Sequence, residues 1–193
     1  MNPKPLTPNP LLRLGFIIPL IFWLTLFIGG WMREDYHHLT SLVSELGRIG
    51  TSTQYLFTLG LTICALLSVA FILALHRRAR AMGISSFPVL ILLPAFSFPI
   101  LGAALFPLPL PLHGILGSPA MLLTASPLLA LILWGRKFGT RFLIITSAIL
   151  LITALGYLVF TPTLDAYPGL KQRFAHTGWT LWFVYLGWLF NKG

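Results

Sequence analysis

Residues whose side chains could do chemistry gather in three short segments between long apolar runs. The first segment, 33–50, reads REDYHHLTSLVSELGRIG and holds three of the four acidic residues of the chain. The second is built around His113, and the third contains Arg173 and His176, three positions apart. Carboxylate, imidazole and guanidinium groups serve acid–base catalysis, metal binding and phosphate recognition. Any such chemistry requires the fold to bring these segments together.

A binding cluster would combine polar residues from all three segments. The fork of an arginine matches phosphate oxygens, and a carboxylate with a histidine could bind a polar headgroup. The primary candidates for ligand binding are Ser44, Glu45, His113, Arg173 and His176. The secondary candidates are Asp35, His38 and Gln54.

Two catalytic arrangements of the same residues stay open. His38, His113 and His176 could hold a zinc ion with an open position for water, although no H-x-x-x-H or H-E-x-x-H spacing is present. Ser44 could act as a nucleophile with His113 as its base, although no G-x-S-x-G elbow is present. The sequence therefore predicts no cofactor and no metal site, keeps zinc as an alternative, and assigns no catalytic residue.

Composition indicates the class of protein that positions these groups. Hydrophobic residues make up 56% of the 193 residues and charged residues only 9%, whereas soluble domains carry about 25% charged residues. Apolar runs of about 20 residues, long enough to cross a bilayer, recur along the chain. These features predict an integral membrane protein.

Six apolar runs predict six transmembrane helices in a single domain, 1–193. Backbone groups in lipid must be paired within their own segment, and the runs lack the strict alternation of barrel strands. The predicted fold is therefore an all-α bundle. Its spans are expected at about 14–32, 53–75, 87–106, 115–134, 142–160 and 170–190.

Basic residues are distributed unequally between the two predicted sides of the membrane. One side has nine: Lys4, Arg13, Arg77, Arg78, Arg80, Arg136, Lys137, Arg141 and Lys192. The other has four: Arg33, Arg48, Lys171 and Arg173. Because basic loops stay in the cytoplasm, we expect a plasma (inner) membrane protein with both termini cytoplasmic and the candidate cluster outside. The net charge of +9 then indicates membrane lipids, not nucleic acid, as partners.

The first outer loop is predicted to contain a short amphipathic helix over about 36–46. Leu39, Leu42 and Leu46 would share one face, opposite Glu45. The helix is too short to span the membrane and would lie at the outer interface, either facing water and headgroups or covering a cavity as a lid.

The three segments are also expected to meet. We predict that Glu45, His113 and Arg173 share one water-bridged hydrogen-bond network, with an Arg173–Glu45 pair at the membrane edge. Such a pair would offset the free energy required to place either charge there alone.

Three pieces of the chain resemble a known family. They are HLTSLVSELGRIGTSTQYLF, LFP followed by HGILG, and GLKQRFAHTGW. In this order they resemble the Domain of Unknown Function 998 (DUF998) family of multi-pass prokaryotic membrane proteins. More distantly, the chain is similar to the Frag1/DRAM/Sfk1 family, whose members are associated with lipid remodelling, lipid asymmetry and autophagy. The resemblance implies functional positions at Ser44, Glu45, Gly47, His113, Gly169 and Arg173.

Three functions are open at this point. The favoured interpretation is an uncharacterised membrane protein that binds a lipid or a lipid-phosphate headgroup at an outward-facing polar cavity. The second is a membrane-embedded hydrolase or transferase, with or without a metal. The third is an accessory or regulatory subunit whose outer surface binds a protein partner.

Overall fold

The computed structural model describes residues 9–192, and these residues form helices, turns and no strand. The all-α class predicted from the sequence is confirmed. The α-helices are α1 (Leu14–Trp31), α2 (Gln54–Ala81), α3 (Phe87–Leu90), α4 (Phe98–Leu105), α5 (Pro111–Gly117), α6 (Ala125–Ala154) and α7 (Pro168–Lys192). Short helices of other types are η1 (Pro10–Arg13), η2 (Val43–Gly47), η3 (Leu93–Ser97), η4 (Ser118–Thr124) and η5 (Leu155–Phe160).

Four helical stretches of the described residues are long and apolar enough to cross a membrane. They are Pro10–Trp31, Gln54–Ala81, Phe87–Leu105 and Pro111–Phe160. This finding supports the prediction of a membrane protein with transmembrane helices. The last stretch is 50 residues long, well beyond the roughly 20 residues that one crossing needs.

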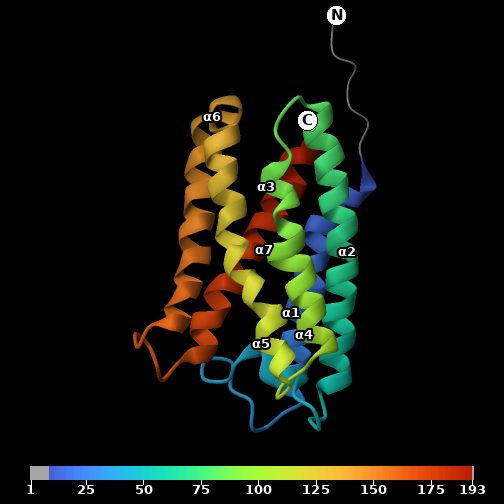
Figure 1. Ribbon diagram of the computed structural model, residues 1–193, viewed down its shortest axis with the longest axis vertical. Helices are drawn as coiled ribbons and strands as arrows, with labels where there is room; N and C mark the ends of the chain where they lie inside the picture. Colours follow the sequence, from blue (N-terminus) through green and yellow to red (C-terminus); the bar gives the residue numbers. More distant parts are fainter. Residues whose placement is uncertain (1–8, 193) are drawn as a thin grey trace, which may run out of the picture.

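The long last stretch folds back on itself inside α6. Gly139 has φ 74° and ψ −170°, a backbone conformation that glycine adopts readily because it has no Cβ. Figure 1 shows the two limbs of α6 side by side, joined by this turn. Close packing at the turn is evident at Gly135, where an added Cβ would lie 2.7 Å from Leu143 Cδ2. A single apolar stretch thus supplies two antiparallel limbs.

Prolines interrupt the third apolar stretch. Pro94 and Pro99 lack a backbone N–H, and the helix passes from α3 through the π-helix η3 into α4 around them. A carbonyl in this region is bound from elsewhere: the hydroxyl of Ser126 donates to Pro88 O. Residues of this interrupted helix, among them Phe96 and Pro99, line the cavity described below.

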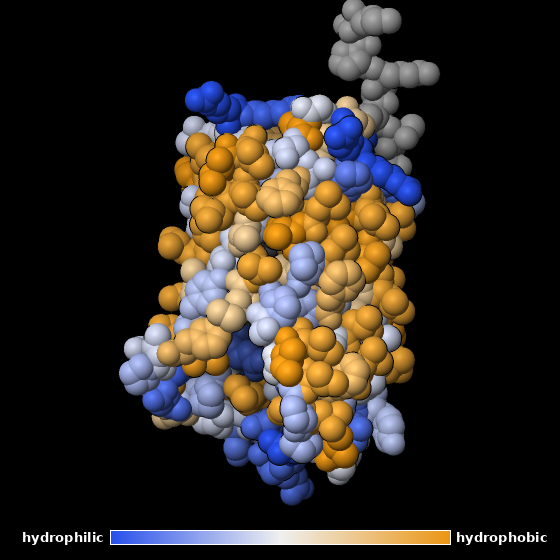
Figure 2. Space-filling model, in the orientation of Figure 1, coloured by the Kyte–Doolittle hydropathy of each residue, from blue (hydrophilic) through white to orange (hydrophobic). Residues whose placement is uncertain are grey.

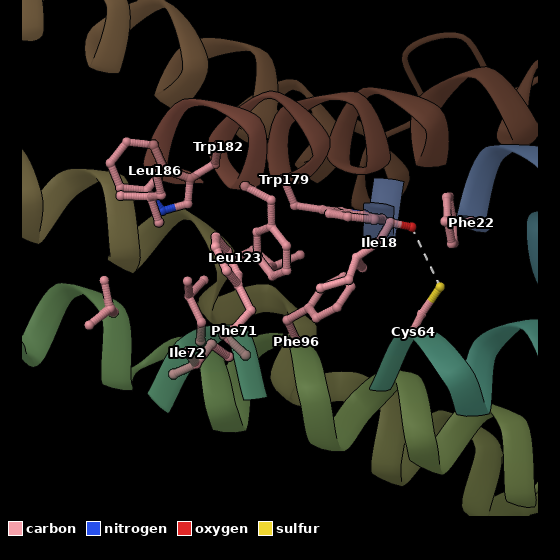
Figure 3. Packing of buried hydrophobic residues seen from close by; sticks show 14 of the residues in the cluster. Ile18, Phe22, Cys64, Phe71, Ile72, Phe96, Leu123, Trp179, Trp182 and Leu186 are labelled. Atoms are coloured by element: carbon pink, nitrogen blue, oxygen red, sulfur yellow. Dashed lines mark hydrogen bonds between the residues drawn. The ribbon is translucent and has the colours of Figure 1, made fainter. Parts of the chain in front are cut away.

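α7 packs against the core through aromatic side chains and small residues. Figure 3 shows Phe96 and Trp179 among the buried hydrophobic side chains, and their ring centroids are 4.4 Å apart. Gly178 faces Thr153 of α6, and a Cβ on Gly178 would lie 2.2 Å from Thr153 Oγ1. Because lipid provides no hydrophobic driving force between helices, close packing of this kind stabilises membrane bundles.

Basic segments gather at one end of the bundle. Figure 1 shows the end of α2, the turn of α6 and the end of α7 at the top, and the loops around 32–53 and 161–167 at the bottom. In Figure 2, hydrophilic side chains lie at both ends, and the surface between them is mostly apolar. Lys4, counted with the basic side in the sequence, lies outside the described residues.

The structure differs from the amphipathic helix predicted over 36–46. This stretch forms turns until η2 begins at Val43, and Leu39 is 51% exposed instead of packed. The reason is that α7 supplies its hydrogen bonds. The N–H of Leu170 donates to Leu39 O at 2.9 Å, and the N–H of Val43 donates to Gln172 Oε1 at 2.7 Å. Backbone groups paired with α7 do not need a local helix.

Candidate functional site

A cavity of about 440 Å³ lies between the helices, in the half of the bundle near the loops 32–53 and 161–167. Its lining is mostly apolar and includes aromatic side chains from α1, α2, η3 and α7. Figure 2 shows hydrophilic atoms recessed in a hollow in the lower half of one face. The polar lining residues are Ser44, His113, Ser118, Thr124, Thr153, Tyr157, Gln172 and His176. Among the described residues, no aspartate, glutamate, lysine or arginine lines it.

The cavity brings together three of the five primary candidates. Ser44 comes from η2, His113 from α5 and His176 from α7. Glu45 and Arg173 are not part of the lining. The predicted cluster is therefore divided between the cavity and a second group of residues beside it.

His176 is held in one orientation by aromatic neighbours. Its Nδ1 accepts a hydrogen bond from Trp179 Nε1 at 3.1 Å, and its ring lies 4.8 Å from the Phe22 ring. Its Nε2 atom is buried and has no hydrogen-bond partner among residues 9–192. Buried polar atoms in native proteins are nearly always paired, so this nitrogen is a candidate contact for a ligand.

His113 lines the cavity from the first turn of α5. Its Nδ1 is 2.9 Å from Phe106 O. Because a carbonyl oxygen can only accept, Nδ1 carries the proton, and in the neutral ring Nε2 is an acceptor. The cavity is therefore lined by two imidazoles, His113 from α5 and His176 from α7. Nδ1 donates a hydrogen bond in His113 and accepts one in His176.

Arg173 fastens the first loop to α7. Its Nη1 donates to Gly169 O at 3.0 Å and to Ser41 O at 3.4 Å. Its Nη2 donates to Tyr36 Oη at 2.7 Å and to His38 Nδ1 at 2.9 Å. We call these four contacts the Arg173 anchor. Both terminal nitrogens are thus occupied by protein acceptors, which leaves the guanidinium poorly placed to bind a phosphate.

The predicted Arg173–Glu45 pair is not formed. The ion pairs within the described chain are Arg33–Asp35 and Lys171–Asp165. Glu45 contributes its backbone oxygen, which accepts from Arg33 Nη1 at 2.8 Å. Arg173 binds acceptors in 36–41 because that turn of the loop, and not η2, packs against the guanidinium.

The secondary candidates all have hydrogen-bond partners within the protein. Asp35 accepts from Arg33 on the surface, and this bond lowers the pKa of its carboxyl group. His38 belongs to the Arg173 anchor. Gln54, the first residue of α2, accepts from the N–H of Gly50 at 2.9 Å. None of the three lines the cavity.

The histidines considered for zinc are not grouped. His38 lies in the Arg173 anchor, whereas His113 and His176 line the cavity. Within residues 9–192, no three side chains of histidine, cysteine, aspartate or glutamate come close enough to hold a metal ion together.

Sequence reasoning missed several cavity residues. Thr153 and Tyr157 stand four positions apart in the fifth apolar run, a spacing that places both on one helix face, so this signal was available. The hydroxyls of Tyr157 and Thr124 are 2.6 Å apart, which links η5 to the end of η4. Gln172 gave no local signal, because the residue it binds, Val43, is 129 positions away.

The Arg173 anchor is expected to weaken in acid. Burial and the positive charge of Arg173 lower the pKa of His38 below its ordinary value of 6.5. The folded state therefore favours neutral His38, and the unfolded chain takes up the proton first as the pH falls. Stability is accordingly greatest above 6.5 and decreases as the pH falls below it. Thermal unfolding in detergent between about pH 7.5 and about pH 5 measures this loss.

His38→Asn separates this effect from general acid sensitivity. The amide oxygen of asparagine can replace Nδ1 as the acceptor but does not titrate in this range. The variant should lose less thermal stability in acid than the unmodified protein. His37→Asn, at the exposed neighbouring histidine, should behave like the unmodified protein. Equal losses in all three proteins would rule out His38 as the titrating group.

Comparison with protein-family models gives a match over most of the chain. A family model described as a protein of unknown function, DUF998, matches residues 16–189. No curated protein and no solved structure matches the chain. The more distant resemblance to the Frag1/DRAM/Sfk1 family stays a prediction.

Proposed function

The chain belongs to the DUF998 family of proteins of unknown function, and we propose that it is a membrane protein that binds a lipid in the cavity beside His176. The observation that supports this most directly is the cavity itself, about 440 Å³ and mostly apolar. Small-molecule sites are typically about 300–1,000 Å³, apolar, and equipped with a few polar groups that orient the ligand.

A lipid suits the position and the lining of the cavity. It lies among helices whose outer surface is apolar over most of its height (Figure 2), so lipid chains surround the protein at that depth. Aromatic and aliphatic side chains such as Phe22, Phe96 and Leu61 would contact an acyl or isoprenoid chain. The polar residues Ser44 and Gln172 belong to the loop end and would lie near the polar end of the lipid.

The catalytic alternative has no comparable support. No hydrogen bond joins Ser44 to His113 within the described residues, and His113 Nδ1 is occupied by Phe106 O. A nucleophile and its base would be expected within hydrogen-bond reach of each other. Binding without catalysis is therefore the function that we propose.

We further propose six membrane crossings within a single domain. The turn at Gly139 divides the last apolar stretch into two limbs, and α7 lies alongside α1 and α6 as a further helix. With the basic end in the cytoplasm of a plasma-membrane protein, as the charge bias favours, the cavity would open toward the outer side.

Filling the cavity tests lipid binding. Gly117 lines it with φ −76° and ψ −25°, and an added Cβ would meet no atom within 4 Å. Gly117→Leu should therefore fold and occupy part of the lipid site. We expect the unmodified protein, extracted in mild detergent, to retain a lipid in native mass spectrometry. Gly117→Leu should retain it with about tenfold lower occupancy, equivalent to about 1.4 kcal/mol of binding free energy.

Ile115→Phe is the matched control. Ile115 lies on the same short helix, is 63% exposed and does not line the cavity. This variant adds similar bulk on the outer surface and should retain lipid like the unmodified protein. Equal retention by Gly117→Leu, or an unmodified protein that carries no lipid under any mild extraction, would refute lipid binding in this cavity.

A further inference from the structure

We infer that the bound lipid is uncharged and offers a hydroxyl or carbonyl oxygen to His176. This inference rests on the proposed lipid-binding function and specifies its ligand class. It follows from three features of the cavity: a lining without charged residues in the described part of the chain, the protonation state of His176 and the complementary state of His113.

The charge of the lining excludes a buried phosphate. No lysine or arginine among the described residues lines the cavity, and an ionised group buried without a partner carries a very large desolvation penalty. Arg173 is the cation that the sequence suggested for this role. Its terminal nitrogens instead donate to Gly169, Ser41, Tyr36 and His38.

The contact between His176 and Trp179 determines which nitrogen carries the proton. Indole N–H is only a donor, so the 3.1 Å bond from Trp179 requires an unprotonated Nδ1 on His176. The ring is then neutral and carries its proton on Nε2. This N–H is buried and without a partner among the described residues. Because His176 is one of the residues that line the cavity, a ligand oxygen that reaches this N–H would supply the missing partner.

His113 has the opposite arrangement. Its Nδ1–H donates to Phe106 O, which makes Nε2 the acceptor in the neutral ring. A cavity lined by one neutral donor and one neutral acceptor suits a hydroxyl group, which can both accept and donate a hydrogen bond. Diacylglycerols and long-chain alcohols have this chemistry, whereas a phosphate would bring charge that the lining does not neutralise.

Two lipids with identical chains provide the test. Dioleoylglycerol and dioleoylphosphatidate differ only in that the second carries a phosphate in place of the free hydroxyl. Versions with brominated chains quench tryptophan fluorescence on binding, and Trp179 lines the cavity. Titrated into the delipidated full-length protein in detergent, the glycerolipid is expected to bind at least about tenfold more tightly than the phosphatidate.

Variants of His176 test the donor. His176→Phe keeps an aromatic ring without the N–H and should weaken dioleoylglycerol binding about tenfold. His176→Gln retains a side-chain N–H and should restore part of the affinity. His37→Phe makes the same replacement on the exposed loop and should leave binding unchanged.

The outcomes distinguish a failure of the proposed ligand class from a failure of lipid binding itself. Phosphatidate that binds as tightly as dioleoylglycerol to the unmodified protein would overturn the uncharged class and leave lipid binding in place. Dioleoylglycerol binding that is unaffected in a folded His176→Phe variant would overturn the role of His176. If neither lipid binds and none co-purifies, the proposed function fails together with this inference. The comparison of the two lipids uses only the unmodified protein, so it can be made even if a variant does not fold.

Discussion

Replacing Gly178 with alanine is expected to destabilise the fold by about 2–3 kcal/mol, because the new methyl group overpacks the contact between α7 and α6. The Cβ would lie 2.2 Å from Thr153 Oγ1 and 2.6 Å from Thr153 Cα. A hydroxyl can rotate away, but the Cα belongs to the backbone, so the two helices must separate. Thermal unfolding in detergent, with size-exclusion chromatography to follow loss of the monodisperse protein, measures the effect.

Gly114→Ala is the matched control for this substitution. Gly114 also lies in a helix, and an added Cβ there would meet nothing within 4 Å. Alanine has the higher helix propensity, by about 1 kcal/mol in a helix interior, so this variant should be as stable as the unmodified protein or slightly more stable. If the two variants unfold at the same temperature, the close packing of α7 on α6 at Gly178 is incorrect.

The second large effect is expected at Arg173. Arg173→Met keeps the length and much of the packing of the side chain but removes all four donated hydrogen bonds of the anchor. Hydrogen bonds to a charged group contribute about 1.5–3 kcal/mol each but are not additive within one network. We expect a total loss of about 3 kcal/mol in the free energy of unfolding, measured by thermal or denaturant unfolding in detergent.

Two further variants show whether the anchor is responsible. Tyr36 is 5% exposed, and its hydroxyl accepts from Arg173, so Tyr36→Phe should lower stability by about 1 kcal/mol in the unmodified protein. In the Arg173→Met background the same change should have almost no effect. Glu45→Gln should stay within about 0.5 kcal/mol, because Glu45 forms no ion pair with Arg173 in the described residues. If the losses in the free energy of unfolding caused by Tyr36→Phe and Arg173→Met were additive, Tyr36 and Arg173 would not act together in one anchor.

The sequence predicted part of the membership of the candidate site. Ser44, His113 and His176 do line one cavity, whereas Glu45 and Arg173 do not. Their chemistry could not be predicted, because the proton positions follow from partners in the fold. Trp179 determines the state of His176, and Phe106 determines that of His113.

Composition and periodicity did determine the class of the protein. The helices, the apolar stretches and the separation of basic from acidic loops follow from the hydrophobicity and charge of successive residues, which can be read without knowledge of the fold. In lipid, the backbone groups of a single segment must form hydrogen bonds with one another, independently of which helices pack beside it. A long apolar run therefore predicts a helix reliably. The turn inside the last stretch coincides with the basic segment around Gly139, which the topology that we propose places at the membrane surface.

Tertiary structure alone decided how the polar groups of the loop 36–46 were paired with α7. The loop 36–46 has the spacing of an amphipathic helix, yet the N–H of Leu170 and the side chains of Gln172 and Arg173 bind its polar groups and hold it in turns. Those partners are more than 120 positions away along the chain, and a guanidinium at the membrane edge could equally have reached Glu45. The rotation of α7 about its own axis, fixed by the contact of Gly178 with Thr153 and by aromatic packing around Trp179, directs Arg173 to the loop and His176 into the cavity.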